Sequence, residues 1–199
     1  MLHMFTSPRE SNGASANGLR CIEHGQLMDE ESAMMMADHD VVLVTQPFEY
    51  DESLRAVAND VQWEKYLEVV GGWKRTAELL KHYKVRMGFG TDLVFTPQNN
   101  GQQANMLARF ATWFSPSEML RMITSSNGEL LSRSGARNPY RSGALGVIRE
   151  GAYADILLVD GNPLQDVSIL GDDGRNIPLV MKDGTVYKDN LPSPAPIPG

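Results

Sequence analysis

Three side chains of types that bind metal ions each stand near the end of a short apolar run. His3 lies in the apolar start of the chain, His24 ends the run 19–24, and Asp92 follows the run 85–90. Neutral imidazole and carboxylate groups are ordinary ligands of Zn²⁺. In a parallel β/α barrel the active site is built at the carboxyl ends of the strands. The spacing therefore predicts that the three side chains meet around a divalent metal ion.

Each of these residues also has a simpler interpretation, which stays open. A lone histidine is usually a hydrogen-bonded structural residue, and an aspartate after Gly-Thr is usually a turn or a helix cap. The other histidines do not fit the pattern, because His39 precedes its strand and His82 lies in a polar helical stretch. Cys21 is the single cysteine and is expected in the core, so neither a disulfide nor a multi-cysteine zinc site can form within the chain.

The elements that position these residues alternate between strands and helices. The runs 2–5, 19–24, 41–45 and 85–90 predict strands, and the β-branched run 41–45 suits a strand buried on both faces. Helices are expected from capping boxes at Ser7 and Ser115, from Asp29, and over roughly 72–84 and 100–111. This alternation implies an α/β fold with a parallel sheet and helical crossovers.

The character changes after about residue 143. The stretch 155–160 predicts a strand, and Asp183-Gly184 between 179–181 and 185–187 is a strong hairpin signal. The last nine residues hold four prolines and predict an extended tail.

Composition excludes several classes of partner. The 199 residues carry 18 Lys and Arg against 25 Asp and Glu, a formal net charge of −7, which argues against nucleic acid and anionic membranes. No apolar run is long enough to cross a membrane. The first residues lack a signal-peptide pattern, so the compartment stays open with the cytoplasm favoured.

Together these motifs resemble the amidohydrolase superfamily, and within it the branch of imidazolonepropionase-related and Xaa-Pro dipeptidase enzymes. The resemblance rests on Cys21-Ile22-Glu23-His24-Gly25, Gly90-Thr91-Asp92, the segment 146–164 and the segment 180–187. It covers His3 to about Lys188, and the ordered set is specific although no single motif is.

The resemblance implies a (β/α)₈ barrel with a small β-sandwich. Residues 1–142 would be a partial barrel containing strands five to eight, 143–190 part of the sandwich, and 191–199 the proline-rich tail. By the resemblance, His3 and His24 ligate one metal, while Asp92 ligates a second and accepts a proton from the attacking water. Zinc is the expected metal, with one or two ions in the complete protein.

The sequence departs from the family pattern in its missing first half. The His-x-His of strand one and the lysine of strand four have no counterpart here. The chain is therefore expected to be the C-terminal half of such a protein, either truncated or a natural half-protein. Its partner would be the missing N-terminal half or a second copy of the chain.

The function implied is hydrolysis of a C–N amide bond in a small molecule, a dipeptide or an N-acyl amino acid, with little activity for this chain alone. Gln26, Gln46, Phe48 and Tyr50 follow strand ends and are expected to line the substrate pocket. Two alternatives stay open. One is a non-catalytic half-barrel that self-associates or needs a partner chain, and the other is a deaminase of a cyclic amidine.

Overall fold

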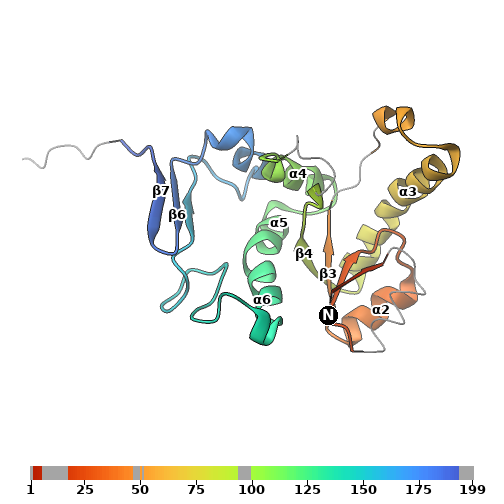
Figure 1. The fold of residues 1–199 in the computed structure, drawn as a ribbon, viewed down its shortest axis with the longest axis horizontal. Helices are drawn as coiled ribbons and strands as arrows, with labels where there is room; N and C mark the ends of the chain where they lie inside the picture. Colours follow the sequence, from red (N-terminus) through yellow and green to blue (C-terminus); the bar gives the residue numbers. More distant parts are fainter. Residues whose placement is uncertain (1, 6–17, 47–49, 51, 94–99, 193–199) are drawn as a thin grey trace, which may run out of the picture.

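The chain forms two β-sheets joined by helices (Figure 1). The computed structural model describes residues 2–5, 18–46, 50, 52–93 and 100–192. The strands of the parallel sheet, in both spatial and chain order, are β1 (Leu2–Phe5), β2 (Cys21–His24), β3 (Val42–Thr45) and β4 (Arg86–Phe89). The antiparallel sheet contains β5 (Ile156–Leu158), β6 (Leu179–Lys182) and β7 (Thr185–Asp189).

Among the described residues, helices connect β2 to β3 and β3 to β4, as the sequence predicts for a βα alternation. Those between β2 and β4 are α2 (Glu30–Asp38), the 3₁₀ helix η1 (Glu52–Ala56) and α3 (Asp60–His82). Those after β4 are α4 (Gln103–Ala108), η4 (Arg109–Thr112), α5 (Pro116–Arg121), the π-helical turn η5 (Met122–Ser126), α6 (Asn127–Ser132) and η6 (Gly135–Arg137). The helix expected from Ser7 lies outside the described residues.

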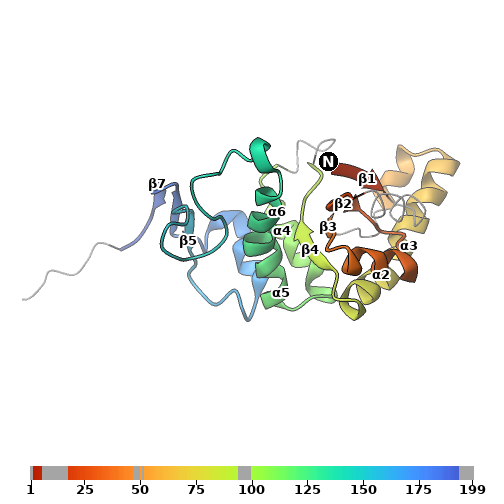
Figure 2. The ribbon, with the colours of Figure 1, turned by 90° about the horizontal axis from the view of Figure 1, so that it is seen from below.

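The main core lies between one face of the parallel sheet and the helices beside it (Figure 2). Ile22 and Leu43 supply its sheet side, and Trp73 of α3, Phe110 of η4 and Met119 of α5 pack against them, all fully buried or nearly so. Burial of large apolar side chains is the main favourable term in folding. This core therefore holds β2 and β3 in place, and predicted site residues lie at the carboxyl ends of these strands.

Helix α3 begins well before the position expected from the sequence. Asn59 caps it in a reciprocal capping box with Gln62, and the helix continues through Gly71 and Gly72. A Cβ at Gly72 would lie 2.9 Å from the backbone oxygen of Gln26. Gly72 thus permits close packing between α3 and the β2–α2 loop, and it does not mark a helix end.

The helical segment from α5 to α6 lies along the free edge of β4. It begins at the predicted capping box of Ser115 with Glu118. Met119 joins the main core, whereas Leu130 packs on a small cluster of Cys21, Val42 and Val44. One continuous helical segment therefore contacts both faces of the sheet.

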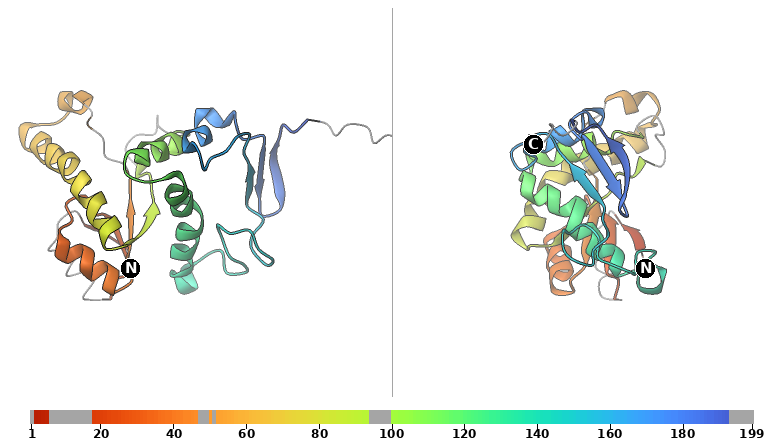
Figure 3. Two further views of the ribbon diagram at one scale, coloured as in Figure 1. Left: turned by 180° about the vertical axis from the view of Figure 1, so that it is seen from behind. Right: turned by 90° about the vertical axis from the view of Figure 1, so that its left-hand side faces the viewer.

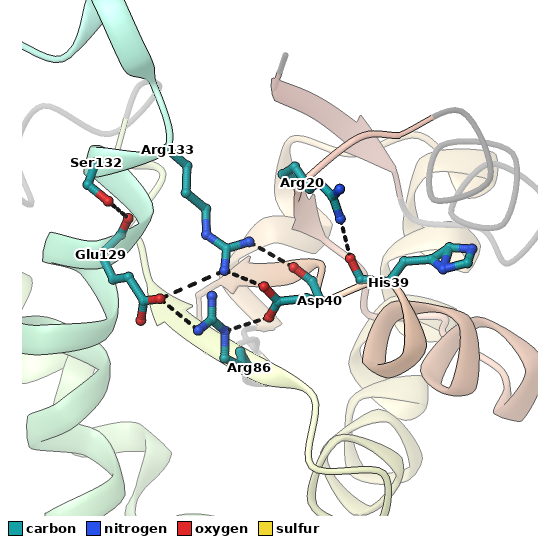
Figure 4. Close-up of polar contacts among 7 residues, drawn as sticks. All are labelled: Arg20, His39, Asp40, Arg86, Glu129, Ser132 and Arg133. Carbon is teal, nitrogen blue, oxygen red and sulfur yellow. Dashed lines mark hydrogen bonds and ion pairs between the residues drawn. The ribbon is translucent and has the colours of Figure 1, made fainter.

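An ion-pair network ties α6 to the amino ends of β3 and β4 (Figure 4). Asp40 has a left-handed backbone, with φ of 53°, and its carboxylate pairs with Arg133 at 2.7 Å and with Arg86 at 3.1 Å. Arg86 also pairs with Glu129 at 2.8 Å. We call Asp40, Arg86, Glu129 and Arg133 the Asp40 network.

The antiparallel sheet stands at the end of the molecule opposite α3 (Figure 3). The hairpin predicted at Asp183-Gly184 is confirmed, since β6 pairs with β7 across these two residues. Their φ angles of 47° and 76° match the turn type that Asp-Gly favours. None of the helices in the described part of the chain has the length and apolar content needed to cross a bilayer.

Candidate functional site

The carboxyl ends of β2 and β4 bring His24 and Asp92 to one amide group. His24 ends β2, Asp92 follows β4, and Gln46 comes directly after β3, which lies between them. The Nε2 of Gln46 lies 2.9 Å from Nδ1 of His24 and 3.3 Å from Oδ2 of Asp92. Two of the three predicted ligands therefore share one partner, although they come from distant parts of the sequence.

The backbone at these strand ends is turned sharply. His24 and Asp92 have φ angles of 72° and 49°, in the left-handed region that L-residues with side chains rarely adopt. Gly25 follows with φ of 68°, and a Cβ there would lie 2.6 Å from Cδ1 of Leu43. Such strained conformations occur often at functional sites. Here the turns direct the chain away from the strands just where the site residues lie.

The turn after His24 sends Gln26, which was expected to line the substrate pocket, into the protein interior. Its side chain is fully buried and Nε2 donates to Oγ1 of Thr45 at 3.4 Å. The backbone carbonyl of Gln26 accepts from Oγ1 of Thr76 at 2.7 Å. Because two successive residues before it have positive φ, the chain enters the core at once.

The structure gives less detail for the other predicted site residues, His3, Phe48 and Tyr50. His3 lies in β1, paired in register with Ile22 of β2. Phe48 lies outside the described residues. Tyr50 is 58% exposed, and its ring meets Trp63 edge-on with 6.0 Å between centroids.

A second polar pair lies beside the site, on the face of the sheet that α6 covers. Sγ of Cys21 lies 3.6 Å from Oε1 of Glu23. Burial raises the pKa of the Glu23 carboxyl above its ordinary value, and burial together with the nearby carboxylate raises the pKa of Cys21 to about 12. A thiol with that pKa stays protonated at neutral pH, so Cys21 is not a nucleophile here.

These two residues open onto a cavity of about 800 Å³ between the sheet and α6. Val44, Asn127 and Arg133 also line it, whereas His24, Gln46 and Asp92 do not. The cavity is therefore separate from the shared amide, and no motif in the sequence predicted it.

The types of these side chains suit a divalent metal ion, but the described residues supply too few ligands for a complete site. An imidazole nitrogen and a carboxylate oxygen face the same point, and both are normal zinc ligands. Within the described residues, no three His, Cys, Asp or Glu side chains gather as a full metal site would require. His24 and Asp92 could thus supply part of a site whose other ligands come from elsewhere.

Sequence reasoning placed Gln46 near this site but did not identify its contact with both residues, because that contact joins three strand ends.

Comparison with known proteins agrees with the sequence resemblance. The sequence pattern of the amidohydrolase family matches residues 3–187. A search of curated proteins finds no match.

Solved structures share the fold. A crystal structure of an amidohydrolase is 34% identical with a TM-score of 0.81, covering 96% of this chain and 45% of its own. A prolidase complexed with N-methylphosphonate-L-proline is 29% identical with a TM-score of 0.79, covering 94% and 45%. A Xaa-Pro dipeptidase with bound methionine is 24% identical with a TM-score of 0.75, covering 94% and 44%. The chain thus spans about half the length of these proteins, and over nearly all of its own length it belongs to the amidohydrolase family.

Proposed function

We propose that this chain carries part of a metal-dependent active site that hydrolyses a C–N amide bond. The observation that carries the proposal is the convergence of His24 and Asp92 on the amide of Gln46. The amidohydrolase family match and the resemblance to a prolidase support an amide bond as the target, in preference to the amidine of a deaminase. The substrate class we propose is a dipeptide or an N-acyl amino acid.

His3 and His24, from neighbouring strands, would hold one metal ion, and Asp92 would hold a second, as the resemblance implies. A divalent metal such as zinc would supply a Lewis acid that polarises the scissile carbonyl and makes hydroxide available near neutral pH. Asp92 lies at the exposed end of the site. Its carboxylate would accept the proton of the attacking water and return it to the leaving amine, as a general base and then a general acid.

Of the residues predicted to line the substrate pocket, Tyr50 is the one that we propose contacts the substrate. It follows β3 by a few residues, is exposed, and is braced edge-on by Trp63. An aromatic ring held in this way offers an apolar surface with a polar hydroxyl at its tip.

The strands of this chain would correspond to strands five to eight of the family barrel. The chain covers about 45% of the matched amidohydrolase and prolidase structures. We therefore propose that the remaining ligands come from a segment or a partner that supplies the other half of the barrel, and that the 199-residue chain alone has little or no activity.

A zinc-binding measurement on the 199-residue chain tests this proposal. We expect zinc binding that is lost or strongly weakened in H24A and in D92A. H39A is the matched control, because His39 is exposed at the end of α2 and precedes β3. Zinc binding that H24A and D92A leave unchanged would exclude this site.

The non-catalytic half-barrel is the second candidate, because the chain covers less than half of the amidohydrolase and prolidase structures. An experiment that adds the other half of the barrel, prepared from one of the matched relatives, distinguishes the enzyme from the non-catalytic half-barrel. Restored hydrolysis of a dipeptide panel, dependent on Asp92, supports the enzyme. A stable complex without hydrolysis supports the second candidate.

A further inference from the structure

The cavity between the parallel sheet and α6 combines apolar surface with exposed positive charge. Val44 and Phe89 of the sheet and Leu130 of α6 line it, and its volume is about 800 Å³. Arg20 and Arg137 also line it, and both are exposed. Pockets for small molecules have volumes of this order and pair mainly apolar surface with a few polar groups. The cavity therefore has the size and the composition of a ligand site.

The charge of this cavity is opposite to that of the chain, which has a formal net charge of −7. Among the described residues that line the cavity, the charged side chains are three arginines, Arg20, Arg133 and Arg137, and one carboxylate, Glu23. Glu23 is half-buried and lies 3.6 Å from Sγ of Cys21. A local excess of positive charge on an acidic chain favours an anion as the ligand.

Other parts of the chain hold two of these arginines, and Arg137 is different (Figure 4). Arg133 pairs with the carboxylate of Asp40 at 2.7 Å, and Nη1 of Arg20 donates to the carbonyl of His39 at 2.5 Å. The Arg137 side chain makes no hydrogen bond or ion pair with the residues that the structure describes. Its guanidinium donors are therefore available to a ligand.

A hydroxyl group accompanies the Arg137 guanidinium. Ser134 directly precedes the 3₁₀ turn η6, which ends at Arg137, and its side chain makes no capping hydrogen bond. Side chains three residues apart in a 3₁₀ turn lie on the same side, and both of these line the cavity. Arginine binds carboxylates through two parallel hydrogen bonds, which gives it a preference for this class of anion.

We propose that the cavity binds a monocarboxylate with an apolar chain. The carboxylate is bound by Arg137 and Ser134, and the chain lies between Leu130 and the sheet. Such a ligand gains from burial of its apolar chain and from charge-assisted hydrogen bonds at its head. Because His24, Gln46 and Asp92 do not line the cavity, this inference does not rest on the proposed function.

Calorimetric titration of the 199-residue chain with octanoate tests the inference. We expect octanoate to bind, and R137M to weaken its binding roughly tenfold, the loss of one charge-assisted hydrogen bond of about 1.4 kcal/mol. Octanol has the same chain and no charge, so it should bind equally to wild type and to R137M. Butyrate should bind at least roughly tenfold more weakly than octanoate, because it buries fewer methylene groups.

Two further variants make the titration specific to this cavity. R149M is the matched control, because Arg149 is also exposed but does not line the cavity, and it should bind octanoate as wild type does. A136W places a bulky ring at an exposed residue that does line it, and should block octanoate by volume and not by charge. The inference therefore stays testable if either R137M or A136W fails to fold.

Alkylation of Cys21 locates the bound ligand. Cys21 is the single cysteine of the chain and lines the cavity, so octanoate should slow its reaction with a small maleimide in wild type but not in R137M. No octanoate binding, or binding that folded R137M and A136W both leave unchanged, overturns the inference. Protection of Cys21 by the other half of the barrel but not by octanoate would show that a partner fills the cavity, and it would overturn the inference as well.

Discussion

Asn127 bonds both polar backbone groups of Phe89 on the free edge of β4. Its Oδ1 accepts from the backbone N–H of Phe89 at 3.2 Å, and its Nδ2 donates to the carbonyl of Phe89 at 2.9 Å. A neighbouring strand would make the same two bonds, so at this residue one side chain from α6 takes the place of a strand. Exposed strand edges promote unwanted pairing with other strands, and Asn127 blocks such pairing at Phe89.

Loss of this contact should destabilise the chain. N127A leaves the N–H and C=O of Phe89, on a part-buried strand, without their partner, and we expect the free energy of unfolding to fall by about 2 kcal/mol. S126A, at the preceding position of the same helical segment, should change it by less than about 0.5 kcal/mol. Urea denaturation measures both, and an N127A protein as stable as S126A would contradict the role given to Asn127.

Two glycines with the same backbone conformation should respond differently to alanine. At Gly146, with φ of 68°, a Cβ would lie 2.2 Å from the backbone oxygen of Thr124. At Gly151, with φ of 77°, a Cβ would meet nothing within 4 Å. We expect G151A to cost about 1 kcal/mol from the left-handed backbone alone and G146A to cost at least about 3 kcal/mol. Thermal unfolding compares them, and similar melting temperatures would show that the loop at Gly146 moves freely away from α5 and α6.

The Asp40 network should contribute modestly and depend on salt. Arg133 is 21% exposed, but Asp40 is 58% exposed, so solvent screens their attraction. A double-mutant cycle of D40N and R133M should give a coupling free energy of about 0.5–1 kcal/mol at low salt that shrinks at 1 M NaCl. Asn tolerates the left-handed backbone of residue 40, so D40N tests the charge and not the turn. Coupling that is unchanged by salt would mean that hydrogen bonds, and not charge, hold α6 in place.

Local signals in the sequence were sufficient for much of the fold. The capping box at Ser115, the cap at Asp29 and the Asp183-Gly184 hairpin each depend on residues a few positions apart, and each is present. The strand ends at His24 and Asp92 followed from apolar runs in the same way. The resemblance to a known family added the roles that local patterns cannot give.

Contacts between distant segments were not predictable in this way. The sequence predicted a helix over roughly 72–84, whereas α3 begins at Asp60 and continues through Gly72, which packs on the backbone of Gln26. Gln26 was expected to line the substrate pocket because it follows a strand end, whereas the two positive φ angles before it turn its side chain into the interior. The link from Gln46 to His24 and Asp92 depends on the order of strands in the sheet, which no single segment encodes.

The carboxylate of Asp155 should make the stability of the antiparallel sheet depend on pH. Its Oδ1 accepts from the backbone N–H of Asp183 at 2.7 Å, and its Oδ2 pairs with Lys182 at 3.0 Å. The bond from the Asp183 amide, followed by that from Lys182, lowers the pKa of Asp155 below its ordinary value of 3.8. Because the folded pKa lies below the unfolded one, the stabilisation is fully present above about pH 4. It is lost as the pH falls through the folded pKa.

The variant D155A isolates this effect from the other carboxylates. At pH 7 it should lower the free energy of unfolding by roughly 1 kcal/mol, a value kept small because the ion pair with Lys182 is partly exposed. The difference between wild type and D155A should stay constant from pH 7 to about pH 5 and shrink toward pH 3, since protonated Asp155 no longer attracts Lys182 or accepts as strongly from Asp183. Urea denaturation at pH 7, 5 and 3 gives this difference directly. If this difference does not change with pH, Asp155 stabilises the sheet through its shape and not through its charge. Only the contribution of the charge is lost when the carboxylate is protonated.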